Sequence, residues 1–141
     1  MMIRLCETDA DRAKAMAIRF AVFVDEQNVP AELEPDEYDA EAIHLLLEDG
    51  DTAFGTARIT DRGNGIAKIG RVAILKPFRG KGFGAILMRH ILEIARERRF
   101  TVAALDAQTY ALPFYEKLGF VAEGPEFDDA GIPHRRMTRP L

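Results

Sequence analysis

The stretch Arg71-Val72-Ala73-Ile74-Leu75-Lys76-Pro77-Phe78-Arg79-Gly80-Lys81-Gly82-Phe83-Gly84 decides the fold of this chain. An apolar segment, residues 66–75, ends where Pro77 forces a turn, and three glycines then lead into a long helix. The start of that helix offers no Ser, Thr, Asp or Asn as a cap, so its first amides lack an internal partner. An external anion can satisfy these amides, and Arg79 and Lys81 favour a phosphate or pyrophosphate. The alternative is a glycine-rich connection that binds nothing.

Two other phosphate-binding motifs fit this stretch less well. A Walker A loop needs Lys and then Ser or Thr after its last glycine, and Gly84-Ala85 supplies neither. The dinucleotide fingerprint fits better, because Gly80, Gly82 and Ala85 have its spacing and Asp106 follows the next strand. However, only 35 of the 141 residues follow Asp106. That is too few for the remaining βα units of a Rossmann sheet, so a nicotinamide enzyme is disfavoured.

Outward from the glycines, hydrophobic periodicity predicts an α+β fold with a mixed sheet. The segments expected before the glycines are a strand at 3–6, a helix that Thr8 or Asp9 caps, a loop or broken helix at 28–42, and antiparallel strands at 44–48, 52–60 and 66–75. Those expected after them are a helix ending near Arg99, a strand at 101–105, a short helix at 111–118, and strands at 120–123 and 132–138. Because a helix joins 66–75 to 101–105, these two strands should run parallel.

The same periodicity predicts which face each long helix buries. The expected apolar stripe of the first helix is Ala13, Met16, Ala17, Phe20 and Val24. The expected stripe of the second is Phe83, Leu87, Ile91, Ile94 and Ala95.

Composition and charge narrow the class of protein. A length of 141 residues predicts a single domain, 1–141, and 48% hydrophobic with 30% charged residues is typical of a globular chain. The single cysteine, Cys6, and three scattered histidines predict neither an internal disulfide nor a metal site.

No apolar run reaches the ~18–20 residues that span a bilayer, and the first nine residues turn acidic too early for a signal peptide. We therefore expect a cytoplasmic protein with no membrane partner. The net charge of −4 argues against nucleic acid.

Acidic residues are concentrated between Asp25 and Glu41, which hold eight acids and no Lys or Arg. The rest of the chain carries 19 basic and 15 acidic residues, a net +4. Two interpretations stay open. The segment is a solvated loop, or it favours a cationic acceptor in an enzyme that also holds an anionic cofactor.

Two motifs together resemble a known family. Arg79-Gly80-Lys81-Gly82-Phe83-Gly84 matches the Arg/Gln-x-x-Gly-x-Gly/Ala pyrophosphate loop of the GNAT acetyltransferases. The segment 108–120, with Gln108, Ala111, Phe114-Tyr115 and Gly119-Phe120, resembles the second GNAT signature, Asn-x-x-Ala-x-x-Leu-Tyr-x-x-x-Gly-Phe. Two motifs in this order and about 24 residues apart are far more specific than either alone. Gln108 departs from the Asn that many members carry.

Further matches point to one branch of that family. Val22-Phe23-Val24-x-Glu26-Gln27-x-Val29-Pro30, His44 and Gly131-Ile132-Pro133-His134 are similar to the small bacterial ElaA/YjcF-type proteins. The resemblance runs over essentially the whole chain.

The resemblance implies the GNAT fold, β-α-loop-β-β-β-α-β-α-β-β, with a splayed parallel strand pair. It also implies acetyl-CoA as the acyl donor, with its pantetheine arm in the gap between those strands, bonded to backbone groups of Val72 to Ile74. The Ile74 amide would polarise the thioester carbonyl. The implied cofactor contacts are Val72, Ala73, Ile74, Arg79, Gly80, Lys81, Gly82, Phe83, Gly84, Gln108, Phe114 and Tyr115.

Catalytic roles follow from the same resemblance. Tyr115 is implied to be the general acid that protonates the departing thiolate, although a tyrosine packed on the cofactor for shape is the alternative. An amine acceptor with an ordinary pKa of ~10.4 is mostly protonated at pH 7, so a base is expected. The candidate bases are Glu26, Asp106, His44 and His134, each of which also has a purely structural interpretation. The expected catalytic residues are Tyr115, Ile74, Glu26 and His134, and the expected acceptor contacts are Glu26, Gln27, His44, Asp106 and His134.

The sequence thus predicts direct transfer of an acetyl group from acetyl-CoA to a primary amine in a ternary complex. The acceptor would be a small-molecule or peptide amine, with no nucleic acid or membrane partner, and formation of a homodimer stays open. The alternative is a non-catalytic acyl-CoA-binding regulatory module of the same fold, against which Tyr115 counts.

Overall fold

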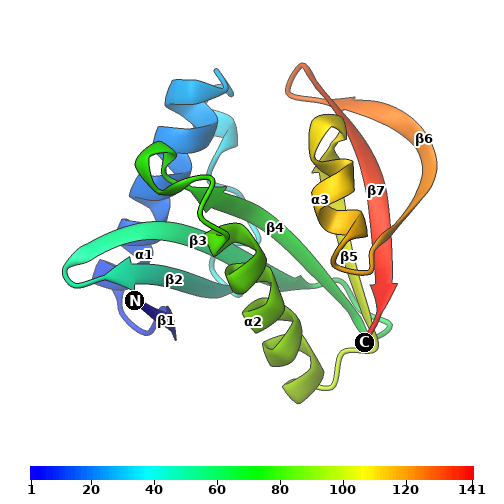
Figure 1. Cartoon of the computed structure of the whole chain (residues 1–141), viewed down its shortest axis with the longest axis horizontal. Coiled ribbons are helices and arrows are strands. Elements are labelled where there is room, and N and C mark those ends of the chain that lie inside the picture. The colour runs from blue at the N-terminus through cyan, green and yellow to red at the C-terminus, as the bar shows by residue number, and fades with distance from the viewer.

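Seven strands form one mixed sheet in the computed structural model, which describes residues 1–141 (Figure 1). The strands are β1 (Met2–Leu5), β2 (Ile43–Asp49), β3 (Thr52–Asp61), β4 (Ile66–Ile74), β5 (Val102–Gln108), β6 (Val121–Asp129) and β7 (Ile132–Pro140). Their order across the sheet is β1-β2-β3-β4-β5-β7-β6, so β7 lies between β5 and β6. Only β4 and β5 run parallel, and all other neighbours are antiparallel.

Three α-helices and several single turns complete the chain. The helices are α1 (Asp9–Arg19), α2 (Phe83–Glu97) and α3 (Leu112–Glu116). Thr8 caps α1, because its side chain accepts a hydrogen bond from the Asp11 amide. A π-helical turn, Phe20–Glu26, continues α1. Short 3-10 turns lie at Ala31–Leu33, Lys76–Phe78 and Thr109–Ala111.

The predicted α+β class, element order and parallel strand pair are confirmed, with one substantial change in length. The last hairpin is longer than expected, since β6 runs to Asp129 instead of ending at Glu123. Gly124 and Pro125 interrupt the pattern in the sequence, but the strand passes them through an irregularity between Glu123 and Phe127. Gly124 allows this passage with a φ of 76°.

The predicted buried face of α1 is wrong. Ala13 and Ala17 are exposed, whereas the buried residues of this helix and its π-helical continuation are Asp11, Ala15, Ile18, Arg19 and Val22. Two charged residues lie on the buried face, so apolar periodicity points to the wrong side. For α2 the predicted stripe is right at Leu87, Ile91 and Ala95, and Met88 and Leu92 join it in the core.

Helices cover both faces of the sheet. Leu45 and Leu46 are neighbours on β2 and therefore point to opposite faces. Leu45 packs in the core cluster that contains Leu87 and Ile91 of α2, while Leu46 packs with Ile18 of α1. Figure 1 shows α1 behind the sheet and α2 in front of it.

The parallel strands β4 and β5 separate soon after they meet. They pair only from Ile66 to Lys68 on β4 and from Val102 to Ala104 on β5. Beyond these pairs the strands diverge, as Figure 1 shows, while β7 pairs along the whole other edge of β5. The divergence opens a gap between the C-terminal halves of β4 and β5, which is the expected splay.

A β-bulge lies on the other edge of β4, where the strand begins to diverge. The register between β3 and β4 shifts between Thr56 and Arg58. Arg71 lies in this bulge with a φ of 52°, a left-handed backbone conformation that is uncommon for a residue other than glycine.

A buried arginine of α1 fixes the acidic segment. Arg19 Nε donates to Glu34 Oε1 at 3.1 Å, and its Nη1 donates to Asp39 Oδ1 at 2.8 Å. Burial alone would raise the pKa of Asp39, but hydrogen bonds from Arg19 and from its neighbours lower it well below its usual range. Burial raises the pKa of Glu34 in spite of the nearby arginines.

Two further arginines bind the same segment from the sheet. Arg58 donates to both oxygens of Asp36 at 2.7 Å, and Arg71 Nη2 donates to Asp36 Oδ2 at 3.2 Å. The remaining acids of the segment are exposed: Asp25, Glu26, Glu32, Glu37 and Glu41. Neither interpretation of the acidic segment is therefore complete, because part of it is solvated and part neutralises arginines.

We predict that Arg19→Met lowers the free energy of unfolding at pH 7 by about 3–5 kcal/mol, because it removes a buried partner of Glu34 and of the partly buried Asp39. Urea denaturation checks this. The difference from the wild type should shrink below about pH 4, because the stability from the lowered pKa of Asp39 is present above its unfolded pKa and is lost as the pH falls.

Arg12→Met is the matched control. Arg12 is exposed on α1 and contacts Asp9 only at 3.4 Å, so its loss should change stability by no more than about 0.5 kcal/mol. Equal losses in the two variants would contradict the role assigned to Arg19.

Candidate active site

The gap between β4 and β5 opens into a cavity of about 990 Å³, within the size range of small-molecule and cofactor sites. Its lining includes most of the predicted site residues: Gln27, Val72, Ala73, Ile74, Arg79, Gly80, Gly82, Phe83, Gly84, Asp106, Gln108, Phe114, Tyr115 and His134. Three predicted site residues do not line it: Glu26, His44 and Lys81. The structure therefore brings segments from most of the chain together at one site.

The glycine loop presents an open backbone to this cavity. Gly82 is the N-cap of α2, with a φ of 84° and no side-chain cap, as the sequence predicts. Gly80 has a φ of 78°, and a Cβ at Gly80 or Gly82 would meet nothing within 4 Å. A Cβ at Gly84 would instead lie 3.3 Å from the Phe114 ring, so this glycine allows α2 and α3 to approach closely. The first amides of α2 are left available for an anion.

Aromatic side chains on both flanks hold the glycine loop on the sheet. Phe54 of β3 is fully buried and stacks on Phe78 with ring centroids 4.2 Å apart. On its other side it meets Phe83 edge-on at 4.9 Å. Phe78 and Phe83 bracket the loop, so these contacts fix its two ends. Sequence analysis missed Phe54, because nothing distinguishes it from other core residues of a strand.

Glu26 lies at the glycine loop and not among the acceptor-side residues. Arg79 Nη1 and Nη2 donate to the two Glu26 carboxylate oxygens at 2.7 and 2.9 Å. This contact lowers the pKa of Glu26, which makes its carboxylate a weaker base. The geometry therefore does not support the expectation that Glu26 is the catalytic base or an acceptor contact.

The backbone of Ile74 faces the gap. Leu75 donates its N–H to the Phe54 carbonyl of β3 at 2.8 Å. Because partners alternate along an antiparallel pair, the N–H and C=O of Ile74 point away from β3, toward β5. Arg79 Nε donates to that Ile74 carbonyl at 2.8 Å, which agrees with this orientation. The Ile74 N–H is thus a donor directed into the gap.

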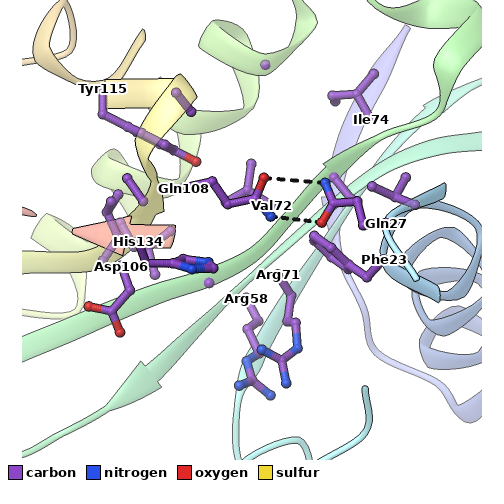
Figure 2. A pocket seen from close by; sticks show the side chains of 18 of the residues that line it. Phe23, Gln27, Arg58, Arg71, Val72, Ile74, Asp106, Gln108, Tyr115 and His134 are labelled. Carbon is purple, nitrogen blue, oxygen red and sulfur yellow. Dashed lines mark hydrogen bonds between the residues drawn. The ribbon is translucent and has the colours of Figure 1, made fainter. Parts of the chain in front are cut away.

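Tyr115 points its hydroxyl into the cavity from α3 (Figure 2). Its ring packs edge-on against Phe114 at 5.0 Å and against Phe120 at 6.0 Å. Burial, with a smaller contribution from Tyr110, raises the pKa of Tyr115 to about 12. The phenol therefore stays protonated at physiological pH and can donate a hydrogen bond.

Gln27 and Gln108 form a reciprocal amide pair across the cavity, shown by dashed lines in Figure 2. Gln108 Nε2 donates to Gln27 Oε1 at 2.8 Å, and Gln27 Nε2 donates to Gln108 Oε1 at 3.5 Å. Gln27 follows the π-helical turn and Gln108 ends β5. The pair joins the two sides of the site by uncharged groups.

His44 and Asp106 are both engaged in the structure. His44 is buried outside the cavity, and its Nε2 donates to the Asp39 carbonyl at 2.9 Å. Burial lowers the pKa of His44. The geometry does not support the expectation that His44 contacts the acceptor, because its ring supports the acidic segment instead. Asp106 lines the cavity but accepts a hydrogen bond from Lys68 Nζ at 2.7 Å.

His134 is the candidate base whose functional atom is free. Its Nδ1 lies 2.7 Å from the Ile132 carbonyl, which can only accept, so Nδ1 carries the proton in the neutral ring. The Nε2 lone pair is then left to face the cavity, into which Figure 2 shows the ring pointing. Phe127 stacks on the ring with centroids 5.9 Å apart and fixes its plane.

Two arginines of the site were missed by sequence analysis. Arg71 lies on β4, before Ile74, and Arg58 lies beside it on β3. Both line the cavity and both bind Asp36. Figure 2 shows their side chains beyond the glutamine pair. The available signal was an arginine in the middle of each of two predicted strands.

Comparisons with known proteins agree with this architecture. The family model described as "Acetyltransferase (GNAT) domain" matches residues 7–141. The uncharacterized N-acetyltransferase YjcF of Bacillus subtilis is 41% identical over 126 residues, which cover 89% of this chain and 89% of YjcF.

Solved structures share the fold. Escherichia coli ElaA superposes with a TM-score of 0.89 at 27% identity, covering 99% of both chains. A GNAT family acetyltransferase from Elizabethkingia anophelis with acetyl-CoA bound superposes with a TM-score of 0.73 at 14% identity, covering 99% of this chain and 97% of that one. The second likeness concerns the fold alone. With a family model over nearly its whole length and YjcF at this identity, the chain belongs to the GNAT acetyltransferase family.

Proposed function

We propose that the protein moves the acetyl group of acetyl-CoA to a primary amine by direct transfer within a ternary complex. The observation that carries this proposal is the gap between β4 and β5, which connects the open glycine loop at α2 with the Tyr115 hydroxyl. A family whose members use acyl-CoA donors, and a structural neighbour with acetyl-CoA bound, support the choice of donor.

The residues present fit this donor. The amides at the start of α2 and the open backbone at Gly80 and Gly82 suit a pyrophosphate. Arg79 donates from both terminal nitrogens to the Glu26 carboxylate, and the same two-donor geometry suits a phosphate. Lys81 is exposed on the same loop and adds positive charge. The gap beyond the loop would take the pantetheine arm along Val72 to Ile74.

When bound, acetyl-CoA supplies an acetyl group activated as a thioester, whose C–S bond breaks as the new C–N bond forms. The Ile74 N–H would donate to the carbonyl oxygen as negative charge develops there. A preorganised donor of this kind is a large catalytic term, often worth about 10²–10³ in rate.

Tyr115 would act on the departing sulfur. Its raised pKa keeps the hydroxyl protonated, so it donates a hydrogen bond to the sulfur, passes a proton to it and regains one from water. In water a thiol with a pKa of about 8.5 is a stronger acid than a phenol, but burial of the thiolate in the same cavity narrows that difference. If Tyr115 had a purely steric role, loss of its hydroxyl would leave kcat unchanged.

His134 would accept the proton that the amine must lose. Among the candidate bases, Glu26 pairs with Arg79, His44 lies outside the cavity and Asp106 pairs with Lys68. His134 alone combines a free nitrogen with a position in the cavity. Imidazole is also the side chain suited to proton transfer near neutral pH.

We predict that Gly82→Val weakens acetyl-CoA binding at least about tenfold, because a branched side chain at this left-handed position displaces the amides of α2. Isothermal titration calorimetry measures the affinity. Gly63→Val is the matched control, since Gly63 has a φ of 80° and equally open surroundings but does not line the cavity. Unchanged affinity in Gly82→Val would remove the pyrophosphate assignment.

Tyr115→Phe should lower kcat about 100-fold or more while the Kd for acetyl-CoA stays nearly unchanged, because only the proton donor is lost. Thiol release at saturating substrates measures kcat. An unaltered kcat would favour the steric role. Tight donor binding without turnover of any amine by the wild type would favour the regulatory module.

His134→Gln should lower kcat/KM for the acceptor at pH 7 by about 100-fold or more. The loss should become smaller as the pH approaches the amine's own pKa, about 10.4, because free amine then no longer needs a base. His90→Gln is the matched control, since His90 is exposed on α2 outside the cavity. A loss that is the same at every pH would mean that His134 only shapes the site.

A further inference from the structure

Arg71 is held in an unusual conformation at the acceptor side of the cavity. It lies in the β4 bulge with a φ of 52°, and its side chain lines the cavity on the side of Ile74 away from the glycine loop. Bulges beside active sites commonly re-aim a side chain, and a strained backbone persists only where the surrounding structure enforces it.

Arg71 is also the least satisfied arginine of its cluster. Arg19 makes four hydrogen bonds and Arg58 makes three, and between them they use the carboxylates of the acidic segment. Arg71 makes two, both from Nη2, to the Glu34 carbonyl and to Asp36. Its Nε is buried without a hydrogen-bond partner, with the Glu34 carboxylate 3.5 Å away, and its Nη1 donates none.

The unused donors of Arg71 favour an anion. Three arginines (Arg19, Arg58 and Arg71) share three carboxylates (Glu34, Asp36 and Asp39), so the formal charges of the cluster balance. The hydrogen bonds are shared unequally, because Arg71 leaves its Nε and Nη1 without an acceptor. The unused hydrogen-bonding capacity of the cluster therefore lies on the arginine that lines the cavity.

A polycationic acceptor finds no comparable partner here. Glu34, Asp36 and Asp106 line the cavity, but each is paired with an arginine or a lysine. The remaining lining carboxylate, Asp129, is exposed at the tip of the β6–β7 hairpin. The acidic segment suggested a cationic acceptor in the sequence, but its carboxylates beside the cavity form ion pairs with arginines.

We propose that the acceptor is a small primary amine that also carries a carboxylate, and that Arg71 binds this carboxylate. The inference rests on the proposed acetyl transfer and names its substrate class. Arg71 precedes Ile74 by three residues, so the two lie no more than about 10 Å apart along the strand. A backbone separation of this order between the thioester site and Arg71 favours acceptors of amino-acid size.

Matched acceptor pairs test the proposal with the full-length protein. The panel contains linear amino acids with one to five methylene groups between the amine and the carboxylate, each compared with the alkylamine of equal length, and diamines as a third series. The kcat/KM of thiol release from acetyl-CoA should be at least about tenfold higher for the best amino acid than for its alkylamine, as expected for a charge-assisted hydrogen bond.

Substitution of Arg71 should remove this preference selectively. In Arg71→Gln the ratio should fall toward one, because the KM for the amino acid rises much more than the KM for the alkylamine of equal length. Arg96→Gln, on the exposed face of α2, is the matched control and should keep the ratio. Calorimetric titration of the best amino acid into the CoA-saturated protein supplies a readout without turnover, and binding should be lost in Arg71→Gln alone.

A second variant covers the case in which Arg71→Gln does not fold. Glu34→Gln removes the carboxylate nearest to Arg71 Nε and keeps the shape, so the KM for the amino acid should fall about threefold or more. An unchanged or higher KM would count against the proposal.

The outcomes separate this inference from the proposed function. If acetyl-CoA does not bind to the folded protein, the proposed function itself is wrong. If acetyl-CoA binds and the kcat/KM for alkylamines or diamines equals that for the amino acids, acetyl transfer stands and the carboxylate inference is overturned. Loss of the preference in Arg96→Gln as well would also overturn the assignment to Arg71.

Discussion

The divergence of β4 and β5 is the constraint on which the rest of the structure depends. Two parallel strands that stop pairing after Lys68 and Ala104 leave the later backbone groups that face the gap without a partner inside the sheet. Such groups need hydrogen bonds from elsewhere, and Arg79 supplies one to Ile74. The fold tolerates the gap because β7 secures the other edge of β5 and β3 secures the other edge of β4. A site for an extended, peptide-like ligand arm is thus a consequence of incomplete strand pairing.

The electrostatics of the molecule follow from where its arginines are buried. Arg19 and Arg58 draw the acidic segment onto the sheet, which positions the residues around it at one side of the cavity. The segment therefore acts mainly as a neutralising layer, and its exposed acids face solvent. Because Arg71 belongs to the same layer yet is incompletely bonded, one cluster combines structural support with the proposed binding of the acceptor.

Local sequence signals predicted the fold and the place of the glycine loop, and they failed where ion pairs decide the arrangement. The glycine loop, the parallel strand pair and the position of Tyr115 follow from patterns within about 40 residues of one another. The buried face of α1 could not be predicted, because Arg19 becomes a core residue only through its ion pairs with Glu34 and Asp39, and hydrophobic periodicity does not show ion pairs. For the same reason Glu26 was expected at the acceptor, because its ion pair with Arg79, 53 positions away, does not show in the sequence. Arg71 was missed because a bulge, which periodicity does not show, gives it its direction.

The glutamine pair adds an energetic consequence for any ligand of the cavity. Gln27 and Gln108 each use one N–H and the carboxamide oxygen in this pair, so a molecule that inserts between the two side chains must first break both hydrogen bonds. Each such bond contributes about 0.5–1.5 kcal/mol net, and observed affinity is the intrinsic affinity less this reorganisation cost. A ligand that replaces both bonds recovers the cost, while one that replaces neither bears it in full. The pair therefore acts as a filter on hydrogen-bonding capacity, independent of the charge and size of what enters.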